Sequence, residues 1–189
     1  MQVLETALDE VKIIVPRVFR DERGYFVETY SRVVCRQMAG IEVEFVHDNH
    51  SRSEQTGVVR GLHFQARPYA QGKLIRGVRG SVQDVVVDIR VGSPTFGRQA
   101  SVILTAGSQA QVWVPKGFAH GLCTLEPGTE VSYKVSDYYN PAADRGLAWD
   151  DPMFGIGWRV APDAAILSDR DRNDPALKDL PAYFQYEHA

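Results

Sequence analysis

This sequence has few cysteines and no excess of basic over acidic residues. Cys35 and Cys123 are the only two cysteines among 189 residues, too few for a disulfide-bonded scaffold and too far apart for a close-spaced metal or redox pair. We expect both to be reduced packing residues. Because the formal net charge is -3, the molecule as a whole does not attract polyphosphate chains. The sequence therefore predicts no nucleic-acid binding, and an anionic ligand would need a local basic cluster.

Long apolar runs are also missing. No segment approaches the length of a membrane span, and the first residues, MQVLETALDEVKII, are acidic where a secretory signal is basic and then apolar. We expect a cytoplasmic protein with no membrane partner. With 44% hydrophobic residues and neither a repeat nor a linker, the chain predicts one domain over 1–189. It would comprise an arm over about 1–45, a barrel over about 46–150 and a C-terminal appendage over about 151–189.

Short β-branched segments, broken by glycine and proline, dominate the sequence from about Val58 onward. Their number and spacing predict a mainly β fold of the sandwich or barrel type. In the segment 84–90 the odd positions are apolar and the even ones include two acids and an arginine, which predicts a strand with one packed and one polar face. The polar face either lines a pocket or meets solvent. Helical patterns predict only short peripheral helices, over Arg32–Ala39 and over 175–180.

Polar side chains concentrate between residues 47 and 73. Arg60, His63, Gln65 and Lys73 lie close together in the sequence, and glycines at 57, 61 and 72 allow tight turns. We expect several of these side chains to converge on one cavity. The alternative is a solvated sheet edge, because exposed polar residues are common.

The segment 115–120 reads Pro-Lys-Gly-Phe-Ala-His, and the pattern Pro-x-Gly-x-x-His resembles the second motif of the cupin superfamily. Gly57 and His63 fit the start of the first cupin motif. Gln65 stands where that motif has its second histidine, and a tyrosine or an alanine, at 69 and 70, where it has glutamate. Only His63 and His120 remain as ligands, whereas catalytic metal sites usually use three. We therefore expect a cupin-like double-stranded β-helix, a jelly-roll barrel, without a metal; a metal-dependent cupin enzyme is the lesser alternative.

Taken together and in order, the motifs resemble those of the dTDP-4-dehydrorhamnose 3,5-epimerase family, the RmlC-type cupins of rhamnose synthesis. A series of matches over most of a chain is far more specific than a single motif. The matching segments are DERGYFVE (21–28), DNHS (48–51), RGLHFQ (60–65), QGKL (71–74), DVVVD (84–88), SPTFG (93–97), PKGFAHG (115–121), YK (133–134), YY (138–139), WDDP (149–152) and LSDRD (167–171).

The resemblance implies an isomerase that needs no cofactor. Its reaction would be the epimerisation of dTDP-4-dehydro-6-deoxy-D-glucose at C3 and C5 to dTDP-4-dehydro-L-rhamnose, in dTDP-L-rhamnose biosynthesis. By the same resemblance His63 is the base, with Asp171 as its partner and Asp84 as the runner-up for that pairing. Tyr133 is the acid, and Lys73 is the charge beside the O4 oxyanion. Inverting a carbon next to a ketone needs a base, an acid on the other face and a positive charge beside the ketone oxygen. Without the resemblance, Tyr133 is a core tyrosine and Lys73 a surface lysine.

The resemblance also implies substrate-binding residues and a partner chain. Arg23 and Arg60 match phosphate contacts, since guanidinium groups pair well with phosphate oxygens; surface salt bridging is the alternative. A homodimer would exchange its N-terminal arms, so that Arg23, Phe26 and Glu28 reach the neighbour's pocket. His47 stands where the family usually has glutamine, which bears on nucleotide-base preference. The remaining matches to the family's pocket are Asn49, Ser51, His120 and Tyr139.

Two other functions stay open. Relatives that invert a single carbon share the same motifs, so a mono-epimerase acting at C3 or C5 only is one alternative. The other is a non-catalytic module that binds a sugar nucleotide. Such a module would have no reason to keep a base, its partner, a lysine and a tyrosine together.

Overall fold

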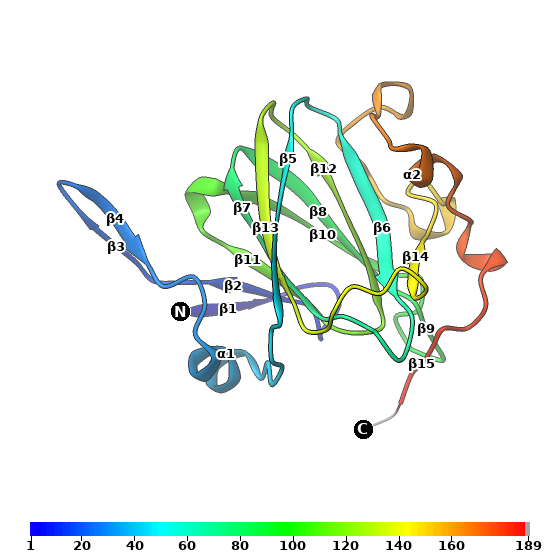
Figure 1. Cartoon of the computed structure of the whole chain (residues 1–189), viewed down its shortest axis with the longest axis horizontal. Helices are drawn as coiled ribbons and strands as arrows, with labels where there is room; N and C mark the ends of the chain where they lie inside the picture. The colour runs from blue at the N-terminus through cyan, green and yellow to red at the C-terminus, as the bar shows by residue number, and fades with distance from the viewer. Residues whose placement is uncertain (188–189) are drawn as a thin grey trace.

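Two antiparallel sheets face each other in the computed structural model, which describes residues 1–187 (Figure 1). The first sheet has six strands, in the order β1 (Gln2–Glu5), β2 (Lys12–Val15), β11 (Gln111–Val114), β7 (Lys73–Arg79), β13 (Thr129–Val135) and β5 (His47–Ser53). The second has five, in the order β10 (Gln99–Thr105), β8 (Ser81–Asp88), β12 (Phe118–Thr124), β6 (Val59–Gln65) and β14 (Asp144–Gly146). The prediction of a mainly β fold is confirmed.

The main core fills the space between the two sheets. Ile75 and Val131 of the six-stranded sheet pack there with Val82 and Val86 of β8. The other side of β8 is also covered, because its odd-numbered valines pack under the C-terminal segment. Strand β8 is therefore buried along its whole length. The alternative in which the polar face of this strand meets solvent is wrong, since Asp84 and Asp88 have no exposed surface.

Only part of the N-terminal region projects from the sandwich. Strands β1 and β2 extend the six-stranded sheet by pairing along β11, whereas the hairpin of β3 (Val18–Asp21) and β4 (Gly24–Val27) points away from it (Figure 1). The predicted helix follows as α1 (Arg32–Ala39) and ends at Gly40, whose φ of 67° is the left-handed conformation of a helix cap. Its buried residue Cys35 packs with Trp113 on the outer face of the six-stranded sheet.

The C-terminal segment covers the outer face of the five-stranded sheet, where Phe154 and Phe184 pack against Phe64. The expected helix over 175–180 is wrong. The structure has only the 3-10 turn Leu177–Asp179 there, and the helix α2 (Asp169–Asn173) comes before it. Pro175 explains the shift, because it lacks an amide hydrogen and holds the residue before it in an extended conformation.

The remaining elements are short. They are the 3-10 helices Ala106–Ser108, Pro152–Phe154 and Pro162–Ala164, and the parallel pair β9 (Arg90–Val91) with β15 (Phe184–Gln185). Within residues 1–187, no helix combines the length and apolar character needed to cross a bilayer. Cys35 and Cys123 are buried free thiols.

Candidate active site

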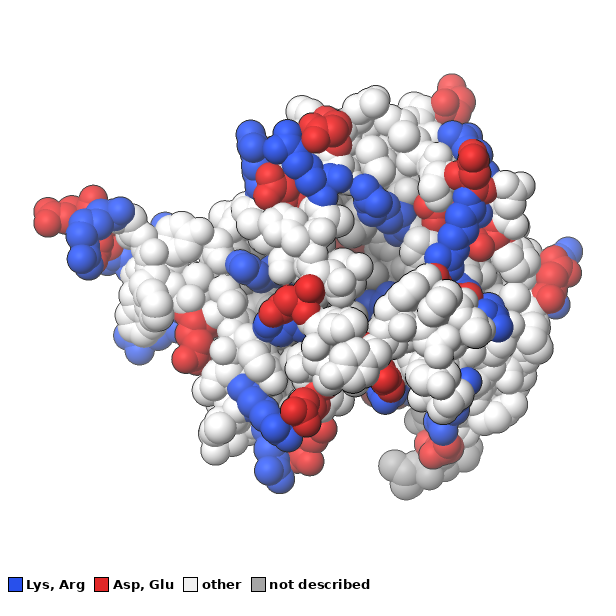
Figure 2. All heavy atoms as spheres, in the orientation of Figure 1, with Lys and Arg blue, Asp and Glu red and all other residues white. Residues whose placement is uncertain are grey.

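A cavity of about 320 Å³ opens between the two sheets and adjoins a second one of about 210 Å³. The five-stranded sheet contributes Arg60 and His63 from β6 and His120 from β12 to the larger cavity; the six-stranded sheet contributes Lys73 and Tyr133. Figure 2 shows a hollow at this place, bordered by basic side chains on both sides. The predicted convergence of polar residues on one cavity is confirmed.

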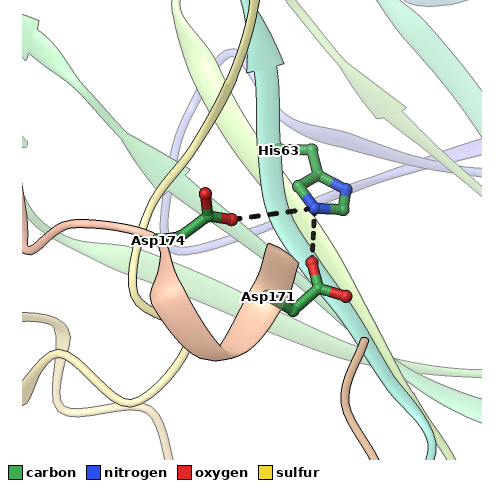
Figure 3. Close-up of side chains that lie close together, drawn as sticks. All are labelled: His63, Asp171 and Asp174. Atoms are coloured by element: carbon green, nitrogen blue, oxygen red, sulfur yellow. Dashed lines mark hydrogen bonds and ion pairs between the residues drawn. The ribbon is translucent and has the colours of Figure 1, made fainter. Parts of the chain in front are cut away.

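His63 is paired with a buried aspartate from a distant part of the chain (Figure 3). Its Nε2 lies 2.6 Å from Oδ1 of Asp171. The Ser168 hydroxyl donates to the other carboxylate oxygen at 2.7 Å and caps α2 by accepting from the Asp171 amide. Burial opposes the ionisation of Asp171, but the hydrogen bonds from His63 and Ser168 outweigh it and hold the pKa of this carboxyl below its usual value. The imidazole therefore faces a carboxylate that is ionised at neutral pH.

The two histidines of the cavity are neighbours across adjacent strands. His63 in β6 is the register partner of His120 in β12, and the register shifts just after His120. The strands approach closely there: a Cβ atom on Gly61, whose φ is 128°, would lie 2.5 Å from the Cα of Gly121. Glycine at these positions lets β6 and β12 come together beside the histidines.

His120 has a buried carboxylate of its own. Its Nε2 is 2.8 Å from Oδ2 of Asp84. The other oxygen of Asp84 is buried without a hydrogen-bond partner in the described part of the chain. Of the two aspartates proposed as the partner of His63, Asp171 makes the contact, and Asp84 contacts His120 instead.

Lys73 and Tyr133 lie on neighbouring strands of the opposite wall. The Lys73 Nζ donates to the backbone carbonyl of His63 at 3.3 Å, so this side chain reaches across to β6. Burial lowers the pKa of Lys73 to about 8, against the attraction of Asp144 and Asp84. Burial raises the pKa of Tyr133. At neutral pH the cavity therefore holds an ammonium group and a protonated phenol.

The sequence did not predict two of the residues that line the cavities, Asp144 and Arg170. Arg170 of α2 donates two hydrogen bonds of 2.6 and 2.9 Å to Asp144 of β14, and the Tyr139 hydroxyl donates to the same carboxylate at 3.1 Å. Burial works against ionisation of Asp144, but Arg170 outweighs it and lowers the pKa of this carboxyl. Arg170 belongs to the matching segment 167–171, so a signal was present for it. Nothing in the sequence around Asp144 marked that residue.

Three of the predicted binding residues lie away from this cavity. Arg23 and Phe26 are on the β3–β4 hairpin, which projects from the sandwich (Figure 1), and Glu28 follows it. All three residues are exposed. Arg23 pairs with Asp21 in the hairpin turn at 2.6 Å. None of these residues lines either of the two cavities of its own chain.

The other predicted binding residues do line the cavities. Ser51 lines the larger one, and His47, Asn49 and Tyr139 line the adjoining one. His47 is exposed and packs edge-on against Tyr138, with ring centroids 4.9 Å apart.

His63, Asp171 and Asp174 bring three potential metal ligands within 4.8 Å of one another (Figure 3). The distance between His63 Nε2 and Asp171 Oδ1 is 2.6 Å. Two ligands bound tetrahedrally to one ion at about 2 Å would lie more than about 3 Å apart. The donor set is therefore a histidine hydrogen-bonded to a carboxylate, which suits acid–base chemistry.

This fold and site define an acid–base enzyme built on a jelly-roll sandwich, with a histidine–carboxylate dyad facing a lysine and a tyrosine. The chain belongs to the dTDP-4-dehydrorhamnose 3,5-epimerase family, whose model matches residues 5–179. The solved structures that it resembles are cupin-type folds, which confirms the predicted fold class.

Relatives and solved structures agree with this placement. A dTDP-4-dehydrorhamnose 3,5-epimerase from Sinorhizobium fredii is 50% identical over 180 residues, which cover 95% of this chain and 91% of the relative. The crystal structure of RmlC from Legionella pneumophila in complex with dTDP-4-keto-L-rhamnose is similar with a TM-score of 0.95 and 41% identity, covering 99% of each chain. A double mutant of ChmJ, a 3'-monoepimerase from Streptomyces bikiniensis, has a TM-score of 0.88 and 31% identity, covering 98% of this chain and 93% of that one.

Proposed function

We propose that this chain converts dTDP-4-dehydro-6-deoxy-D-glucose to dTDP-4-dehydro-L-rhamnose by inverting C3 and C5, a step of dTDP-L-rhamnose biosynthesis. Both carbons flank the C4 ketone, which acidifies their protons, so proton transfer alone achieves the change. One observation carries the proposal: His63 and Tyr133 come from opposite sheets and line the same cavity. A planar enolate between the sheets would have a base on one face and an acid on the other.

His63 is the proposed base. Because its Nε2 is engaged by Asp171, Nδ1 is the nitrogen left to accept a carbon-bound proton. Asp171 orients the ring and stabilises the imidazolium that forms. In the substrate, the hydrogens on C3 and C5 are axial and lie on the same face of the sugar ring. A single base on one wall of the cavity therefore serves both carbons.

Lys73 and Tyr133 are proposed to complete the reaction. Proton removal places negative charge on O4, and an ammonium group that is already in position stabilises this charge without reorganisation. Tyr133 then donates its proton to the carbon from the face opposite His63, which inverts that centre. The raised pKa of the Tyr133 phenol keeps the proton in place until that step.

The nucleotide is proposed to bind at the mouth of the cavity. Arg60 lines the cavity and is exposed. Its guanidinium group donates to the Ser53 hydroxyl and the Arg52 carbonyl, and its remaining N–H groups would bind the diphosphate. Further contacts to the substrate come from the remaining cavity residues predicted above, which are His47, Asn49, Ser51, His120 and Tyr139.

A second copy of the chain is proposed to complete the site. Arg23, Phe26 and Glu28 are exposed on or beside the projecting hairpin, and in a homodimer with exchanged arms they would reach the neighbour's pocket. We also propose that residues 1–189 form one domain and that the enzyme works in the cytoplasm. Sedimentation of the purified chain tests the dimer: a species of twice the 21.1 kDa chain mass is expected, and a monomer at working concentration would contradict it.

Deuterium exchange tests the epimerase function. In D2O the chain should introduce deuterium at both C3 and C5 of the substrate, as followed by NMR. His63→Ala should abolish exchange, whereas Tyr133→Phe should retain proton removal but invert poorly. Tyr30→Phe, outside the cavity in the cluster under α1, is the matched control and should behave as wild type. Absence of enzyme-dependent exchange at both carbons would overturn the proposal, and full activity of both site variants would overturn the two roles.

A mono-epimerase is the second candidate, because the ChmJ structure shows that a protein named a 3'-monoepimerase has a closely similar chain fold. Exchange at one carbon alone, with only that centre inverted, would select it. Turnover that depends on a stoichiometric transition metal would instead favour a metal-dependent cupin enzyme.

A further inference from the structure

A second carboxylate faces the proposed base. Asp174, at the end of α2, places Oδ2 4.0 Å from Nε2 of His63, the ring nitrogen that also contacts Asp171 (Figure 3). This oxygen is buried and has no hydrogen-bond partner within residues 1–187. The mechanism above uses Asp171 alone, so Asp174 is an additional, partly buried acid beside the base.

Gly146 provides the space that this carboxylate occupies. It is the register partner of His63 in β14, and a Cβ atom at this position would overlap Oδ2 of Asp174. The backbone of Gly146 is not in the left-handed region, so its conformation would accept other residues. The need for glycine here comes from the Asp174 carboxylate, which is thus fitted into place against β14.

Charged groups from three elements surround Asp174: His63 on β6, Asp144 on β14, and Arg170 and Asp171 on α2. Burial raises the pKa of the Asp174 carboxyl most strongly, His63 and Arg170 oppose this, and the other two acids add to it. A carboxylate that ionises less readily in the folded state than in the unfolded state lowers stability at neutral pH, and the loss disappears as the pH falls and the group is protonated. Such groups are concentrated at functional sites.

We propose that Asp174 is a positioning residue that acts through His63, because its negative charge stabilises the imidazolium formed when His63 takes the substrate proton. This inference rests on the proposed epimerase function. The carbon-bound proton moves to Nδ1 of His63, and the Nε2 proton stays hydrogen-bonded to Asp171; no bond to Asp174 forms or breaks. Since the imidazolium exists only after proton removal, the effect falls on kcat and leaves KM unchanged.

Asp174→Asn tests the inference because it keeps the shape of the side chain and removes its charge. We expect kcat to fall about 5- to 30-fold, with KM within about twofold of wild type. The acid limb of the kcat pH profile should move to lower pH, because the negative charge of Asp174 beside the base is gone. The Tm at neutral pH should rise by about 2 to 4 °C, because a neutral side chain replaces a partly buried carboxylate whose Oδ2 has no hydrogen-bond partner within residues 1–187. A slower but more stable enzyme is the result that a purely structural role does not produce.

Gly146→Ala is the second variant, because it displaces the Asp174 carboxylate without removing it. It should lower kcat to a similar extent, and it should add little when combined with Asp174→Asn. The matched control is Asp179→Asn, an exposed acid of the same C-terminal segment, which should keep the wild-type kcat and pH profile.

The possible outcomes distinguish a failure of the proposed Asp174 role from a failure of the proposed epimerase function. Wild-type kcat and pH profile in Asp174→Asn, or a fall of Tm together with activity, would overturn the role of Asp174 and leave the epimerase function intact. A wild-type chain that exchanges neither C3 nor C5 would instead overturn the proposed function itself.

Discussion

Raising the pH above about 8 should reduce turnover by removing the charge of Lys73. Burial lowers the pKa of this lysine to about 8, whereas burial raises the pKa of Tyr133 from its ordinary value of 10. At about pH 7 roughly nine tenths of Lys73 is charged, and at about pH 9 roughly one tenth. Because only the ammonium form stabilises the O4 oxyanion, kcat should fall about tenfold between these two conditions.

This loss would reflect chemistry and not unfolding. A lysine whose pKa is lower in the folded than in the unfolded state makes the fold more stable as the pH rises from about 8 toward 10.5, since the unfolded chain then binds more protons. Steady-state kcat should therefore be measured across this range, with circular dichroism at each pH. Asp144→Asn removes the strongest attraction that holds the pKa of Lys73 up, so its fall should begin at lower pH. A level kcat to about pH 9.5, or an unshifted fall in Asp144→Asn, would refute the reasoning.

Three further changes test the dyad, the nucleotide end of the site and the core. Asp171→Asn should lower kcat about 100-fold or more in steady-state assays, because the 2.6 Å bond that orients His63 loses its charged acceptor; a near wild-type kcat would argue against the dyad. Arg60→Met should raise KM about tenfold with kcat within about twofold, since a phosphate contact acts on ground and transition states alike; an unchanged KM would remove Arg60 from the binding site. Asp88→Asn should lower the free energy of unfolding in urea by about 3 kcal/mol, because this fully buried carboxylate accepts from Arg90, Ser93 and Thr95. These hydrogen bonds outweigh burial and lower the pKa of Asp88, so wild-type stability from this group should be lost below about pH 4; equal stability of the two proteins would contradict this.

The regular elements could be predicted where the local pattern decides them. The helix over Arg32–Ala39 has an apolar stripe and a glycine stop, and it forms as expected. Helix α2 has neither, since its five residues are DRDRN. It forms because Ser168 caps it and Asp171 is anchored against His63. Such tertiary causes leave no periodic pattern in a short polar segment.

The residues of the site were easier to predict than their partners. His63 and Asp171 are 108 positions apart in the sequence, so local patterns could not pair them. Their pairing was predicted from the family resemblance alone. Asp144 and Asp174 belong to no matching motif, and their place beside the cavity depends on how β14 and α2 fold back onto β6. Which residues share a wall depends in turn on the strand order, which local sequence patterns do not determine.

The most direct test of the account is a structure of the His63→Asn variant with dTDP-4-dehydro-6-deoxy-D-glucose bound. We expect a sugar ring between the two sheets, with residue 63 facing C3 and C5 on one face, the Tyr133 hydroxyl on the opposite face and Lys73 beside O4. A ring that has both residue 63 and Tyr133 on the same face, or a sugar bound outside the cavity, would contradict it.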